Sequence, residues 1–266
     1  VAAAPSSPAG VPPADAPSVA RPRCELAAAG AGGAEGRPCE RYIILTMQRS
    51  GSSYACQQLD GFQGNSCGGE GFNLGAKKLG GILQHQLRKS AERVGARSWA
   101  AKVFKRLQKE APAPSPLGCA VGFKVHGPGD QYNLHPDTAL LEDASFRKVI
   151  LSRHDSYGQW FSLQRACLSH DWGGKHFSHG QAVDDRSSEE KKITEEHISS
   201  GHPCGEGVNK HFDTYNASKA ALYEEWRGTL RRTGQEALEV STETLSDKEV
   251  MKRMRCFVLG GSWTGR

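Results

Sequence analysis

The sequence predicts an α/β domain with a central, mostly parallel sheet flanked by helices. Short apolar runs rich in Ile, Val and Leu occur at 42–46, 119–125 and 148–151, and stretches with helical periodicity separate them. The first run leads into a Ser/Gly loop and then a helix, which is a P-loop-like strand–loop–helix pattern. Because parallel strands must be joined by crossovers, alternating strands and helices favour a single parallel sheet.

The first 39 residues differ in composition from the rest of the chain. Residues 1–39 are rich in Ala, Pro and Gly, so we expect a disordered tail that buries little apolar surface. The composition changes at about residue 40, and we assign 40–266 to one domain. Within that domain, residues 173–207 are rich in Gly, His and charge, and we expect them to form a long irregular insertion.

Helices are expected where apolar residues recur at helical spacing. The first follows the Ser/Gly loop from Tyr54, and a Pro-rich break is expected at 111–116. Further helices are predicted at 76–110 (one or two surface helices), 137–143, from the third strand to about 170, 210–233 and 247–259. A last short strand is predicted at 237–240.

Composition limits the classes of partner and compartment. The formal charge of +5 suits an anionic ligand but is too small to indicate nucleic acid as a partner, and no apolar run is long enough for a membrane segment. Eight cysteines permit disulfides without indicating their pairing, and Asn216 begins a glycosylation sequon. These features favour the Golgi lumen or secretory pathway, with a cytoplasmic location left open and any targeting segment outside this sequence.

The loop at 48–53 (QRSGSS) has the composition of an anion-binding site. Amide groups at a helix N-terminus favour an anion, and Arg49 adds a fixed charge. Gly51 allows close backbone approach, while Ser52 and Ser53 supply hydroxyl donors. The Gly-Lys-Ser/Thr of an ATP- or GTP-binding loop is absent. The simpler interpretation is a plain turn with a helix cap.

A second basic position follows the third strand. Arg153 ends that strand, and Ser162 lies on the helix after it. A guanidinium binds phosphate through two parallel hydrogen bonds, so this pair can hold a second phosphate. An ordinary strand–helix connection with a surface arginine is the alternative.

These motifs together resemble those of sulfotransferases that use 3′-phosphoadenosine 5′-phosphosulfate (PAPS). The loop at 48–53 is similar to the family's 5′-phosphosulfate loop, Arg153 and Ser162 to its 3′-phosphate element, and 238–260 to its C-terminal ending. The carbohydrate- and trehalose-type group, with algal and bacterial members, is the most similar. The chain departs from the family in having Gln48 where Pro is usual, and in one extra residue between Arg153 and Ser162, which would place His154 at the family's Arg.

The resemblance implies a reaction and roles for individual residues. It implies transfer of a sulfuryl group from PAPS to a hydroxyl or amine of a carbohydrate-like acceptor, with no metal. The residues that it implies for binding PAPS are Arg49, Ser50, Gly51, Ser52, Ser53, Arg153 and Ser162. We predict Arg49, Lys124 and Glu70 as catalytic, with Glu70 as the base and His126 as the next candidate; Gln131 could contact the acceptor.

Two other functions remain open on the sequence. A non-catalytic family member would bind a glycan or sulfated ligand without turnover. A P-loop nucleoside kinase shares the strand–loop–helix logic but would depend on Mg²⁺. The histidines of 173–207 lack regular metal-ligand spacing, so no metal site is predicted there.

Overall fold

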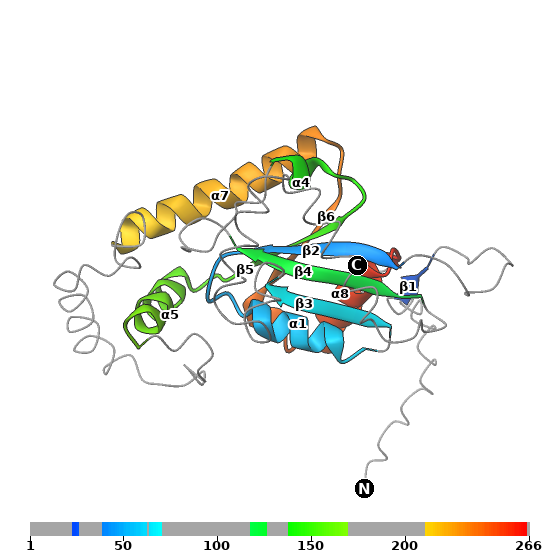
Figure 1. The fold of residues 1–266 in the computed structure, drawn as a ribbon, viewed down its shortest axis with the longest axis horizontal. Helices are drawn as coiled ribbons and strands as arrows, with labels where there is room; N and C mark the ends of the chain where they lie inside the picture. Colours follow the sequence, from blue (N-terminus) through cyan, green and yellow to red (C-terminus); the bar gives the residue numbers. More distant parts are fainter. Residues whose placement is uncertain are drawn as a thin grey trace, which may run out of the picture.

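The protein has a five-stranded parallel sheet at its centre (Figure 1). The computed structural model describes residues 23–26, 39–62, 64–70, 118–126, 138–169 and 211–264. The strands lie in the order β3 (Asn65–Glu70), β4 (Ala120–His126), β2 (Glu40–Thr46), β5 (Arg147–Ser152) and β6 (Ala237–Ser241). Every neighbouring pair in this sheet is parallel, which confirms the predicted fold class.

Helices cover both faces of the sheet. Helices α1 (Ser52–Asp60) and α8 (Lys248–Val258) lie on one face, below the sheet in Figure 1. On the other face lie α4 (Thr138–Glu142), α5 (Ser156–Ser169) and α7 (Phe212–Arg232). A 3₁₀ turn, η3 (Thr242–Thr244), connects β6 towards α8. The helices predicted at 137–143, 210–233 and 247–259 therefore all form.

The side chains of strand β2 contribute to two hydrophobic clusters, one on each face of the sheet. Its side chains alternate, so Ile43 and Leu45 join the cluster beneath α7, while Tyr42 and Ile44 join the cluster beneath α1 and α8. All four are at most 1% exposed. A central parallel strand is buried on both faces, which is why the run is continuously apolar rather than alternating.

The order of the strands places the loop after β2 at the topological switch point of the sheet. Strand β2 lies between β4 and β5, so the chain continues to β3 and β4 on one side of it and to β5 and β6 on the other. At such a switch point the connections leaving neighbouring strands diverge, and a crevice opens at the carboxyl ends of the strands. The fold therefore brings the ends of β2, β4 and β5 together around one site.

Two segments far apart in the sequence, 23–25 and 256–264, are joined by a two-stranded sheet and a disulfide. Strand β1 (Arg23–Glu25) pairs with β7 (Ser262–Thr264), and Cys24 is bonded to Cys256 of α8. Residues 23–26 lie within the segment that we expected to be a disordered tail; for these residues the expectation is wrong, because a cross-link and a strand pairing hold them to the domain.

Two further disulfides join elements close to the sheet. Cys39 is bonded to Cys119 before the paired strands β2 and β4, and Cys56 of α1 is bonded to Cys67 of β3. Strand β3 was not predicted, because its sequence NSCGGE lacks the apolar side chains that mark a strand.

Several predictions lie outside the described residues. These are the surface helices at 76–110, the break at 111–116, the insertion at 173–207 and Gln131. Within the described parts of the chain, no helix has both the length and the apolar character needed to cross a membrane.

Candidate functional site

The loop from β2 to α1 has an unusual backbone. Both Arg49, at φ 58°, and Gly51, at φ 75°, adopt left-handed conformations. A Cβ atom on Gly51 would lie 2.7 Å from Cγ2 of Thr242, so a larger residue does not fit there. Gly51 is also the N-cap of α1 and makes no side-chain cap hydrogen bond, so no cap side chain covers the first-turn amides. A non-glycine residue held left-handed is typical of functional loops.

The serines of this loop divide into two kinds. Ser50 is fully buried; its hydroxyl bonds to the Thr46 hydroxyl, and its carbonyl accepts from Thr242. The hydroxyls of Ser52 and Ser53, on the first turn of α1, instead face the end of β4. The structure therefore gives Ser50 a role in holding the loop, and leaves the other two hydroxyls beside charged and titratable groups.

Two side chains from β4 contact that first turn. Lys124 donates from Nζ to Ser53 Oγ at 2.8 Å, and His126 Nε2 lies 3.4 Å from Ser52 Oγ. Because alternate residues of a strand share a face, both side chains reach the same side of the sheet. Both are nearly buried. The predicted residue Lys124 and the reserve candidate His126 thus lie together at the loop.

The loop also contacts the helix that carries the second predicted motif. Arg49 Nε donates to Ser162 Oγ at 2.9 Å, and Arg153 Nη1 donates to the Arg49 carbonyl at 3.4 Å. One turn before Ser162, Gln159 donates to the Gln48 carbonyl at 2.7 Å. Two segments more than 100 residues apart in sequence therefore form one basic site.

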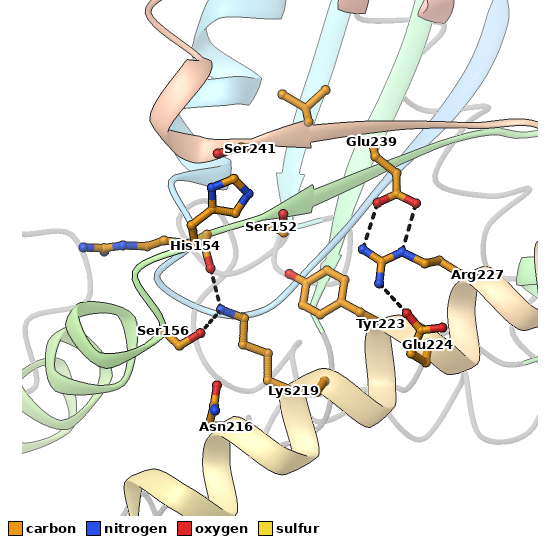
Figure 2. A pocket seen from close by; sticks show the side chains of 13 residues that line it. Ser152, His154, Ser156, Asn216, Lys219, Tyr223, Glu224, Arg227, Glu239 and Ser241 are labelled. Atoms are coloured by element: carbon orange, nitrogen blue, oxygen red, sulfur yellow. Dashed lines mark hydrogen bonds and ion pairs between the residues drawn. The ribbon is translucent and has the colours of Figure 1, made fainter.

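The extra residue before Ser162 is accommodated ahead of α5. Strand β5 ends at Ser152 and α5 begins at Ser156, so residues 153–155 form the turn between them. Asp155 accepts from the Gly158 amide at 2.8 Å and pairs with Arg153 at 3.1 Å. Both Arg153 and His154 line a neighbouring cavity (Figure 2 labels His154), and the Arg153 side chain also donates to the Arg49 carbonyl of the loop. Of these two residues, Arg153 is the one whose side chain contacts the loop at 48–53.

That cavity lies between α7 and β6 and has a volume of about 540 Å³. On one side Arg227 pairs with Glu239 and Glu224, and the Arg227 hydrogen bond lowers the pKa of Glu239. On the other side Lys219 reaches the turn at 153–156, as Figure 2 shows. Burial lowers the pKa of Lys219 to about 8. Arg227 is thus paired with two carboxylates, whereas Lys219 binds a carbonyl and a hydroxyl.

Glu70 lies at the end of β3. Its Cα pairs with that of Lys124 in the adjacent strand, after a register shift that follows Cys67. Its backbone is therefore next to the site, but its side chain lies outside the described structure, and its role stays a prediction. Among the residues that the structure describes, no group of three His, Cys, Asp or Glu side chains could hold a metal.

Sequence reasoning missed four residues that hold the site together: Gln159, Lys219, Thr242 and Glu243. Thr242 lay inside the segment that resembles the family's ending, so its place near the loop had a sequence signal. Lys219 and Gln159 are polar positions on otherwise amphipathic helices, and each is at most 6% exposed. A buried polar residue has no signature in sequence until its partner is known.

The fold and site define an α/β protein with a basic loop at the switch point of a parallel sheet. No protein-family model matches the chain, and no curated protein sequence matches it.

Proposed function

We propose that the protein is a PAPS-dependent sulfotransferase acting on a carbohydrate-like acceptor. One observation carries the proposal, the hydrogen bond from Arg49 to Ser162 at 2.9 Å. The sequence motifs for the 5′-phosphosulfate and the 3′-phosphate are separate in the chain, and a single nucleotide can bridge them only if they meet. Their contact is the condition that this donor requires.

The charges at the site suit a ligand with two anionic ends. The Arg153 guanidinium donates to the Arg49 carbonyl, and the Lys124 ammonium donates to Ser53 on the first turn of α1. Helix α1 directs its N-terminus at the same place, and helix dipole and orphan amides both favour an anion there. We assign the 5′-phosphosulfate to Arg49, Gly51, Ser52 and Ser53, and the 3′-phosphate to Arg153 and Ser162.

The proposed reaction is an in-line transfer. The acceptor oxygen attacks the sulfur of PAPS as the bond from sulfur to the bridging phosphate oxygen breaks, and 3′,5′-adenosine bisphosphate leaves. Lys124 stabilises the charge that develops on the bridging oxygen, and a base takes the acceptor proton. Positioning and charge stabilisation supply most of the rate, as they do in phosphoryl transfer.

Two residues are candidates for that base. The resemblance favours Glu70, whose backbone lies beside Lys124. The geometry supports His126, because its Nε2 is 3.4 Å from Ser52 Oγ, beside the loop that would hold the sulfuryl group. We therefore place His126 first on geometry and keep Glu70 as the alternative.

The decisive experiment measures transfer of label from PAPS to a panel of sugars, phenols and glycolipids in the presence of EDTA. We expect transfer without added metal, which a nucleoside kinase would not give. Arg49→Ala should lower the rate at least a hundredfold, since loss of one such donor costs roughly 2.7–4 kcal/mol. Arg253→Ala, at an exposed position on α8, is the matched control and should retain the full rate.

The outcomes separate the rival functions. Binding of PAPS without transfer to any acceptor would indicate a non-catalytic binding protein. Full activity of a well-folded Arg49→Ala variant would contradict the assignment of the loop. The three disulfides are compatible with the oxidising Golgi lumen or secretory pathway, where we propose that the protein acts.

A further inference from the structure

The turn at residues 153–155 is held from both sides by charged side chains of other elements. Glu243 reaches it from η3, after β6, and Lys219 reaches it from α7. We propose that Glu243 and Lys219 are positioning residues, which clamp this turn so that Arg153 and Ser162 are correctly placed for the 3′-phosphate. The inference rests on the proposed function and adds two residues to which the sequence motifs assign no role.

Glu243 holds the backbone of the turn on one side. One carboxylate oxygen accepts from the His154 amide at 3.1 Å and from the Asp155 amide at 3.4 Å. The other oxygen accepts from Ser241, which fixes the side chain. Burial would raise the pKa of Glu243, but the hydrogen bonds from Ser241 and from backbone amides outweigh it and lower the pKa. The carboxylate is therefore charged at neutral pH and makes charge-assisted bonds to the turn.

Lys219 holds the turn on the other side. Its ammonium donates to the Arg153 carbonyl at 2.5 Å and to Ser156 Oγ at 2.8 Å (Figure 2). Lys219 therefore connects the first residue of the turn to the first residue of α5. The side chain is only 6% exposed. Because the ammonium of this nearly buried lysine donates to both groups, it fixes the start of α5 relative to the end of β5.

The length of the turn at 153–155 explains why it needs support from other elements. The turn is one residue longer than the family pattern, and a longer turn has more conformations available to it. Arg153 is also paired with Asp155 inside the same turn, at 3.1 Å. If the backbone shifted, the guanidinium would move relative to Ser162, and a ligand held by both would be held less well. Small misplacements of such groups have large effects on binding.

The test compares two nucleotides that differ by one phosphate. Calorimetry would measure the affinity of 3′,5′-adenosine bisphosphate and of 5′-AMP for the full chain, Glu243→Gln and Lys219→Met. We expect each variant to bind the bisphosphate about tenfold more weakly and 5′-AMP unchanged. In an Arg153→Ala background, neither change should cause a further loss, because the clamp acts through Arg153.

Matched controls are available on exposed helix surfaces. Glu225→Gln on α7 and Lys252→Met on α8 remove the same charges without touching the turn, and both should bind like the wild type. Thermal melts monitored by circular dichroism would show that each variant is folded. If Lys219→Met did not fold, Glu243→Gln would decide the question alone, since Glu243 is exposed and its replacement conserves shape.

Each outcome has one meaning. A wild-type chain that binds no bisphosphate overturns the proposed function, and the clamp with it. A wild type that binds the bisphosphate, with both folded variants keeping its preference over 5′-AMP, overturns the clamp alone. Equal losses for the two nucleotides would show a general structural role and would also overturn it.

Discussion

At the scale of single residues, the loop after β2 depends on Gly51 for two separate reasons. Its φ of 75° disfavours any L side chain, and Thr242 occupies the space that a Cβ would need. Gly234 has a similar φ of 64° with nothing within 4 Å of an added Cβ. The chain therefore contains its own control for separating backbone strain from steric conflict.

We expect Gly51→Ala to destabilise the protein more than Gly234→Ala. The second change should cost only the left-handed backbone term, about 1–2 kcal/mol. The first adds a clash with Thr242 and should also weaken nucleotide binding. Urea unfolding of both variants measures the difference, and equal losses would show that Thr242 moves aside freely.

The proposed base can also be tested at single residues. We expect His126→Asn to lower the turnover number by two orders of magnitude or more, with little change in affinity for 3′,5′-adenosine bisphosphate, because a base acts on the acceptor. Glu70→Gln is the matched variant. A large loss in Glu70→Gln with normal rates in His126→Asn would reverse the assignment in favour of the carboxylate.

The buried lysines should leave a signature in the pH dependence of stability. Burial lowers the pKa of both Lys219 and Lys148 from 10.5 in the unfolded chain to about 8. Glu243, Asp155 and Arg153 face Lys219, and Asp143 faces Lys148. Between pH 8 and about 9 the unfolded chain binds more protons, so the free energy of unfolding should rise with pH, by at most about 1.4 kcal/mol per pH unit for each lysine. Above about pH 9 the buried tyrosines Tyr42, Tyr215 and Tyr223, whose pKa values burial raises, oppose this rise.

Lys219→Met should flatten this rise by about half, because only Lys148 remains to contribute. Urea midpoints at pH 8, 8.5 and 9 would measure the slopes, with Lys252→Met as the exposed control on α8. An unchanged slope in Lys219→Met would mean that Lys219 keeps an ordinary pKa in the folded protein.

At the scale of elements, helix α5 links the two halves of the site. Two side chains one turn apart, Gln159 and Ser162, contact the loop after β2. The aromatic side chains of the same helix, Trp160 and Phe161, pack into the core beneath α7. One face of α5 is therefore anchored in the core while the adjacent positions meet the loop, which gives the loop a rigid support.

At the scale of the whole molecule, the disulfide between Cys24 and Cys256 closes a very long loop, with a sequence separation of 232. The one between Cys56 and Cys67 spans only 11. If a cross-link acts by restricting the unfolded chain, the first stabilises by roughly 5 kcal/mol and the second by about 3 kcal/mol.

We therefore expect Cys24→Ala with Cys256→Ala to lower the free energy of unfolding more than Cys56→Ala with Cys67→Ala. Urea unfolding under non-reducing conditions compares the two double variants, and peptide mapping confirms which bonds are present. Deletion of residues 1–38 should produce a loss like that of the first pair, because it removes Cys24 and β1. The reverse order would show that local strain or packing dominates over chain restriction.

The sequence by itself determined the elements whose signal is local. Strands at 42–46 and 148–151 and the helix at 210–233 follow from runs and periodicities within a few turns of chain, and the structure reproduces them within about two residues. The loop at 48–53 could be singled out for the same reason, because its Arg, Gly and Ser residues are consecutive, and its role in binding an anion stays a prediction.

Only the tertiary structure decided how distant segments meet. Cysteine pairing, strand β3, the contact of Arg49 with Ser162 across 113 residues, and the two sides of the clamp have no local pattern. Glu243 and Lys219 are ordinary charged residues in sequence, and they become specific only because β6 and α7 pack against the turn after β5. The physical reason is that these bonds join groups brought together by the burial of the sheet, and the free energy of that burial is spread over the whole core.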